Sequence, residues 1–124
     1  MSDDREASSA GVTGLGGVFF RARDPDELKA WYQRVLGVPA EDLMRSDGLV
    51  FAIFDGDTDY FGPSGQGFMV NFRVASLDAM LSRLREAGVE VDEETQEQEG
   101  IGRFGWAADP EGNRFELWEP AEGV

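Results

Sequence analysis

The chain has 124 residues, of which 25 are Asp or Glu and 11 are Lys or Arg, so its formal net charge is −14. A hydrophobic fraction of 41% fits one globular domain with a core. Because Cys and His are both absent, disulfides, zinc–thiolate sites, cysteine nucleophiles and Ser–His–Asp triads are excluded. A surface this acidic repels a phosphate backbone, so we expect no nucleic-acid partner.

The sequence also bears on location. No apolar run approaches the roughly 20 residues of a membrane span, and the acidic start lacks the pattern of a secretion signal. We therefore expect a cytoplasmic protein without a membrane partner. The acidity has two open explanations, genome composition or a high-salt habitat on one side and attraction of a cationic ligand on the other.

The first elements are a tail and a strand. Residues 1–13 are rich in Ser, Asp and Ala and lack periodicity, which predicts a mobile acidic tail before a single domain over 14–124. From Leu15, alternating side chains predict a strand that ends near Arg23.

A helix is expected next, between Asp24 as N-cap and Gly37 as left-handed cap. Apolar residues at helical spacing give it one wide stripe, formed by Leu28, Trp31, Tyr32, Val35 and Leu36. The stripe must pack on an apolar surface, and we expect Trp31 and Tyr32 to belong to the core.

The chain then forms further strands and repeats its pattern. Asp47-Gly48 is a hairpin signal before a strand over 49–54, and a short strand is expected around Tyr60 and Phe61. A strand over 68–74 is followed by a second helix, for which Ser76 is the N-cap and Gly88 the end.

The spacing of these signals indicates an internal duplication. Ser76 lies 52 residues after Asp24, and Gly88 lies 51 residues after Gly37. The second half closes with strands over 103–108 and 114–119, so both halves are a strand, a helix and several strands.

The duplication predicts the fold. We expect an α+β fold of two tandem βαβββ modules, about 14–64 and 65–124, which join edge to edge. Together they form a curved eight-stranded cup with the helices outside.

Two parts of the chain have a distinctive pattern: Asp-Pro-Asp-Glu-Leu-Lys-Ala-Trp-Tyr at 24–32 with Val-Leu-Gly at 35–37, and Asp-Pro-Glu-Gly-Asn-Arg-Phe-Glu-Leu-Trp at 109–118. With these residues the chain resembles the vicinal oxygen chelate superfamily, which includes glyoxalases, bleomycin-resistance proteins and extradiol dioxygenases. The likeness covers about 14–120 and is specific for the fold, not for any activity.

The resemblance implies positions for a divalent metal, and most of them lack a donor here. The first ligand position falls on Gly17, the next on about Met69, and another in the apolar run 49–54. Only Glu116 matches an acidic ligand of the family. Because such ions need several O or N donors, we expect no metal and no other cofactor.

An acidic loop offers an alternative cation site. Asp55, Asp57 and Asp59 have the spacing that opens a calcium loop. However, Tyr60 stands where the loop needs Gly, and Gln66 where a bidentate Glu should close it. A solvated acidic loop is therefore the favoured interpretation.

Strand alternation predicts which side chains face the cup. Gly17, without a side chain, would leave room for a ligand or water. Glu116 is the candidate catalytic residue. The predicted ligand-binding residues are Phe19, Arg21, Met69, Asn71, Arg73, Trp106, Arg114 and Trp118. Mostly apolar linings with a few convergent polar groups are typical of small-molecule sites.

Two interpretations stay open for the charged members. In the first, a structural ion network connects Arg21, Arg73 and Glu116. In the second, at least one Arg binds a carboxylate or phosphate of a ligand. Glu116 serves as a proton-transfer base only if burial raises its pKa more than nearby Arg lowers it.

We therefore expect a metal-independent small-molecule-binding protein that works as a homodimer. The alternative is an enzyme of the superfamily, a lyase, an isomerase or epimerase, or a dioxygenase-like protein, with Glu116 as base or residual metal ligand. A purely structural dimerisation module is favoured if the cup is filled by its own side chains. The net charge favours a cationic guest and the arginines an anionic one, and we give the lining more weight.

Overall fold

The computed structural model describes residues 11–38, 43–44 and 49–124. Its strands are β1 (Val12–Ala22), β2 (Leu43–Met44), β3 (Leu49–Asp55), β4 (Phe68–Val74), β5 (Glu90–Val91), β6 (Gln96–Gln98), β7 (Gly102–Ala108) and β8 (Arg114–Pro120). Its helices are α2 (Pro25–Trp31), the π-helical continuation η1 (Tyr32–Leu36) and α3 (Leu77–Glu86). The first strand begins at Val12 rather than Leu15, and the Asp47-Gly48 hairpin signal lies outside the described residues.

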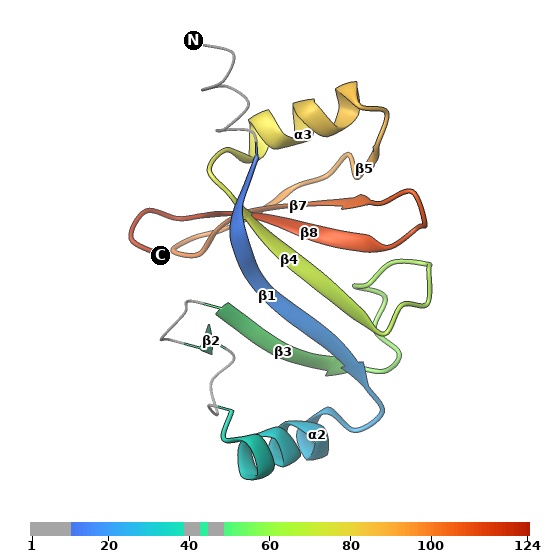
Figure 1. Cartoon of the computed structure of the whole chain (residues 1–124), viewed down its shortest axis with the longest axis vertical. Helices are drawn as coiled ribbons and strands as arrows, with labels where there is room; N and C mark the ends of the chain where they lie inside the picture. Colours follow the sequence, from blue (N-terminus) through green and yellow to red (C-terminus); the bar gives the residue numbers. More distant parts are fainter. Residues whose placement is uncertain (1–10, 39–42, 45–48) are drawn as a thin grey trace.

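All eight strands belong to one mixed sheet with the order β2-β3-β1-β4-β8-β7-β5, and β6 pairs with β7. The sheet is curved and does not close into a barrel (Figure 1). Each half contains one parallel pair, β1 with β3 and β4 with β8, and the antiparallel pair β1–β4 joins the halves. This topology confirms the predicted fold of two related halves.

The predicted short strand around Tyr60 and Phe61 is wrong. Both residues lie in turns of the connection between β3 and β4. Local turns hold this segment, since the Thr58 amide donates to the Asp55 carbonyl at 3.1 Å and the Gly62 amide to the Asp59 carbonyl at 3.0 Å. This connection instead folds onto the sheet, which has consequences for the site.

Helix α3 is docked on the sheet. Its N-cap is Ser76, whose hydroxyl accepts a hydrogen bond from the Ala79 amide at 3.1 Å. Leu77, Met80 and Leu81 are buried against the convex side of β4 and β8. Gly88 follows with a φ of 79° and ends the helix as predicted.

Helix α2 and its continuation η1 are docked much less tightly. Gly37 ends this helix with a φ of 73°, as predicted, and Tyr32 packs on Phe20 and Phe51. The expectation that Trp31 is buried is wrong, because 42% of it is exposed. Leu36 is 62% exposed, because a π-helical turn holds more residues than an α-helical one and rotates the predicted stripe away from the sheet.

Candidate functional site

The side chains that alternation assigned to the cup lie on the concave face of the sheet. Phe19, Met69 and Trp106 form one buried cluster there with Phe61. In β4, Asn71 and Arg73 pair in register with Glu116 and Trp118 of β8. The period of two along each strand was therefore sufficient to find this face.

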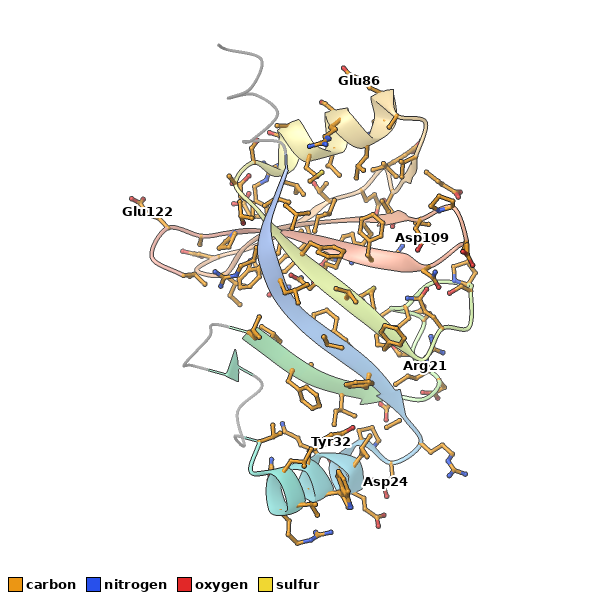
Figure 2. The ribbon with its side chains drawn as sticks, in the orientation of Figure 1. Arg21, Asp24, Tyr32, Glu86, Asp109 and Glu122 are labelled. Atoms are coloured by element: carbon orange, nitrogen blue, oxygen red, sulfur yellow. The ribbon has the colours of Figure 1, made fainter. Side chains whose placement is uncertain are left out.

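The concave face is filled by the protein's own side chains. Phe61 and Met69 are fully buried, and Phe61 comes from the connection between β3 and β4. Arginines hold this connection in place: Arg114 Nε donates to the Tyr60 carbonyl at 3.1 Å and Arg21 Nη1 to the Gly56 carbonyl at 3.3 Å. Arg21 is labelled at the end of β1 in Figure 2.

Gly17 does not leave the space that was expected. A Cβ atom built on Gly17 would overlap the backbone carbonyl of Val50 on the neighbouring strand β3. A Cβ atom on Gly16 would likewise overlap the side-chain oxygen of Asn71. Glycine is required at both positions because another strand or side chain approaches the backbone closely.

Glu116 is the centre of a buried polar cluster. It is 1% exposed and accepts hydrogen bonds from three side chains. Asn71 Nδ2 donates to its Oε1 at 2.5 Å, while Trp106 Nε1, at 2.9 Å, and the Tyr60 hydroxyl both donate to its Oε2. Since all three partners donate, the arrangement fits an ionised carboxylate.

Burial shifts the acidity of two members of this cluster. Loss of solvation raises the pKa of the Glu116 carboxyl above its ordinary 4.5, although the three hydrogen bonds and the charge of Arg114 act in the opposite direction. Burial and the negative charge of Glu116 also raise the pKa of the Tyr60 hydroxyl far above its usual value. Tyr60 therefore stays protonated, and its hydroxyl remains a hydrogen-bond donor.

Of the two interpretations left open for the charged residues, the ion network between Arg21, Arg73 and Glu116 is wrong. The salt bridges of the described residues connect Arg103 with Asp78 and Glu119, and Arg114 with Asp92; none includes Glu116. The Arg21 guanidinium lies over the Phe61 ring at 5.2 Å, and that of Arg73 over Trp118 at 4.7 Å. Both guanidinium groups therefore make cation–π contacts with aromatic side chains rather than ion pairs with Glu116.

One pocket opens directly beside the buried cluster. This Tyr60 pocket has a volume of about 250 Å³ and is lined by Asp59, Tyr60, Asp92, Glu94, Gln96, Trp106 and Arg114. Of the predicted ligand-binding residues, it contains Trp106 and Arg114. Phe19, Met69 and Asn71 lie in the filled interior, and Arg73 and Trp118 lie toward the other end of β4 and β8.

Sequence reasoning missed most of the wall of this pocket. Asp59 and Tyr60 come from the connection after β3, while Asp92 and Glu94 lie between β5 and β6. Loop residues have no fixed period, so alternation cannot place them. The available signal was the aromatic pair Tyr60 and Phe61 within an otherwise polar stretch.

The residues at the family's metal positions do not fit a metal ion. The Glu116 oxygens already accept three hydrogen bonds, and Gly17 and Met69 provide no oxygen or nitrogen side-chain donor. Phe19 in β1 and Asn71 in β4 hold equivalent places in the two halves. Asn71 is paired with Glu116 but Phe19 is paired with Ala52, so the first half has no acid at the position that matches Glu116. Within the described residues, no group of three Asp or Glu side chains is arranged to hold a metal.

Comparison with known proteins agrees with the observed fold. The family model described as "Glyoxalase/Bleomycin resistance protein/Dioxygenase superfamily" matches residues 14–117. The structure is similar to methylmalonyl-CoA epimerase from Mycobacterium tuberculosis, with 25% identity, a TM-score of 0.66 and 89% of each chain covered. No curated protein matches the chain.

Two further solved structures share the fold. One is a Streptomyces coelicolor methylmalonyl-CoA epimerase in complex with 2-nitronate-propionyl-CoA, with 19% identity and a TM-score of 0.64, covering 90% of this chain and 99% of that one. The other is described as an NAD-dependent benzaldehyde dehydrogenase from Legionella pneumophila, with 16% identity and a TM-score of 0.58, covering 85% and 98%. Among the described residues, no helix is long and apolar enough to cross a membrane.

Proposed function

The chain belongs to the Glyoxalase/Bleomycin resistance protein/Dioxygenase superfamily, and on that basis we propose that it is a metal-independent small-molecule-binding protein. This fold supports several activities, so the site must decide between them. The filled concave face by itself favours the structural dimerisation module; the observation that carries the binding proposal instead is the Tyr60 pocket, which opens beside that face. The guest enters this pocket and contacts Tyr60, Trp106 and Arg114.

The pocket has the composition of a small-molecule site. Two aromatic side chains form part of its wall, and carboxylates and one guanidinium supply directional polar groups. Aromatic contacts also hold its wall in place. Tyr60 is stacked on Phe54 with ring centroids 5.3 Å apart, and it lies edge-on to Trp106 with ring centroids 6.0 Å apart. A preformed wall lowers the entropy cost of binding.

Filling the pocket tests this proposal. Gln96 lies on β6 and lines the pocket, so Gln96→Trp places a large ring in it. Compounds that stabilise the wild type in a thermal-shift screen are expected to lose that effect in Gln96→Trp and to keep it in Glu97→Trp. Glu97 is the exposed next residue of the same strand and does not line the pocket. Equal stabilisation of both variants would refute the assignment of the pocket.

A second function, proton-transfer catalysis, is favoured by the Glu116 cluster. A buried acid with a raised pKa is a common feature of catalytic sites. Tyr60 connects it to the pocket, because the residue lines the pocket while its hydroxyl donates to Glu116. The similarity to methylmalonyl-CoA epimerases, which are enzymes, points in the same direction.

In this reaction Glu116 is the base and Tyr60 is the relay. The Tyr60 oxygen takes a proton from the substrate while the Tyr60 hydroxyl proton passes to Glu116 Oε2. Tyr60 stays neutral throughout, as its raised pKa requires. Tyr60 then delivers the proton from Glu116 to a different atom of the intermediate, which gives an isomerase. If the proton instead goes to a departing group, the reaction is that of a lyase.

The two functions are separated by Glu116→Gln. In an enzyme, this variant keeps ligand affinity and loses turnover, followed as exchange of the C2 proton of methylmalonyl-CoA with deuterated water. Tyr60→Phe, which keeps the ring and removes the relay oxygen, is expected to lose turnover as well. Wild-type protein that binds ligands but shows no exchange leaves the binding function in place.

We further propose that the protein works as a homodimer. The exposed apolar side chains of α2 and η1, Trp31, Val35 and Leu36, offer an apolar surface for association. Light scattering of the purified protein tests this: a dimer is expected, and a monomer at micromolar concentration would contradict it.

A further inference from the structure

The charges around the Tyr60 pocket are strongly unequal. Asp59, Asp92 and Glu94 provide three carboxylates, and Arg114 provides a single positive charge. Arg114 is already engaged, since its Nη1 lies 2.9 Å from Asp92 Oδ2 and its Nε donates to the Tyr60 carbonyl. Asp59 and Glu94 are in none of the salt bridges of the described residues.

The other arginines of the concave face do not change this balance. Arg21 and Arg73 do not line the pocket, and each guanidinium lies over an aromatic ring elsewhere on the face. An anionic guest would therefore have to displace Asp92 from Arg114 before it found a partner. The structure therefore does not support the expectation that the arginines make the site prefer an anionic guest.

A second and independent observation concerns the wall behind the pocket. Glu116 is 1% exposed, belongs to no salt bridge of the described residues, and bonds directly to Tyr60 and Trp106 of the wall. Burial raises the pKa of the Tyr60 hydroxyl most, the negative charge of Glu116 adds to this, and the charge of Arg114 acts in the opposite direction. A positive charge in front of the wall is attracted by this buried acid as well as by the rim carboxylates.

We propose that the Tyr60 pocket binds a small organic cation, a protonated amine or an amidinium carried by an aromatic or apolar body. The inference rests on the proposed function, because it names the class of guest for the same pocket. The apolar body packs on Tyr60 and Trp106, and the cation faces Asp59 and Glu94. The net charge of −14 adds long-range attraction of such guests.

Two isosteric probes of opposite charge test this inference. Benzamidine and benzoate are titrated into the protein at neutral pH, with binding followed by calorimetry and ligand-observed NMR. Benzamidine is expected to bind more tightly, with an affinity that falls as the salt concentration rises. Glu94→Gln is expected to weaken benzamidine binding about two- to five-fold. The adjacent and exposed Glu93→Gln, outside the pocket, is the matched control and should bind as the wild type does.

A further variant reverses the preference. Asp92→Asn frees Arg114 and is expected to increase the affinity for benzoate while it decreases that for benzamidine. Preferential binding of benzoate to the wild type overturns the cation class but leaves the proposed function intact, provided that Gln96→Trp abolishes the binding. Binding of neither probe at millimolar concentration, or equal effects of Glu93→Gln and Glu94→Gln, also overturns the inference.

Discussion

The two halves of the sheet come from the same pattern, yet they differ in what they bury. Helix α3 in the second half buries Leu77, Met80 and Leu81, whereas the described side chains of α2 and η1 include no buried one. The same asymmetry holds on the concave face, where Glu116 of the second half corresponds to Ala52 of the first. The second half therefore carries most of the convex core and all of the polar cluster except Tyr60, and a repeated fold does not imply repeated function.

The largest expected effect contrasts one leucine from each helix. Leu77 is fully buried and Leu36 is 62% exposed. Leu77→Ala is expected to lower the free energy of unfolding by about 2–5 kcal/mol, because it leaves a cavity under α3. Leu36→Ala should change it by less than about 0.5 kcal/mol. Urea denaturation measures both, and equal losses would mean that η1 is covered in solution.

A pair of tryptophans gives the next largest contrast. Trp106→Phe removes the indole donor to Glu116 and leaves a small cavity, so we expect a loss of about 1–3 kcal/mol in the free energy of unfolding. Trp31→Phe, at a position that is 42% exposed, should cost less than about 0.5 kcal/mol. Guanidinium denaturation compares the two, and a neutral Trp106→Phe would show that the bond to Glu116 contributes nothing.

The buried acid should also make stability depend on pH. Because the pKa of Glu116 is raised in the folded state, the folded protein holds this proton more tightly than the unfolded chain. Glu116 therefore contributes most to the free energy of unfolding when the pH is below 4.5, the ordinary pKa of its carboxyl. This contribution decreases as the pH rises from there through the raised pKa of the folded state. Glu116→Gln should remove this slope, which is at most about 1.4 kcal/mol per pH unit for one group.

Denaturation midpoints of wild type and Glu116→Gln, compared from acid to neutral pH, check this expectation. Glu97→Gln, at an exposed site on β6, serves as the control and should keep the wild-type slope. A difference between Glu116→Gln and wild type that does not change with pH would show that Glu116 titrates as in the unfolded chain.

The smallest effect concerns the two helix caps, which have the same geometry. Asp24 and Ser76 each accept a hydrogen bond from an amide of the first turn at 3.1 Å. Ser76→Ala is expected to cost about 1 kcal/mol. Asp24→Ala should cost less in global unfolding, since a helix that buries no side chain opens locally at little cost. Hydrogen exchange of the two helices distinguishes local from global opening.

The elements that sequence analysis predicted best are those with a strict period or a cap. Alternation in β4 placed Met69, Asn71 and Arg73 on the concave face, and the signals at Ser76 and Gly88 defined α3. The stripe of the first helix failed at its end, at Val35 and Leu36, because η1 is π-helical and the α-helical period no longer holds there.

The site was predicted only in part, because its members come from two kinds of structure. Glu116, Asn71 and Trp106 lie on strands, and their common face follows from alternation. Tyr60 completes the cluster from a connection whose path depends on how it packs across the sheet. Arg21 and Arg73 were assigned to the correct face but not to their partners, which are the rings of Phe61, from the same connection, and of Trp118, on β8.

The amino-acid sequence by itself determined the duplicated fold, the two helix caps, the acidic charge and the lack of His and Cys, because these depend on composition and on short-range periods. The tertiary structure decided that the concave face is filled, that Gly17 faces a backbone carbonyl, and that Arg114 is held by Asp92. These features depend on contacts between segments far apart in the chain, and short-range patterns carry no information about the path of the connection that brings them together.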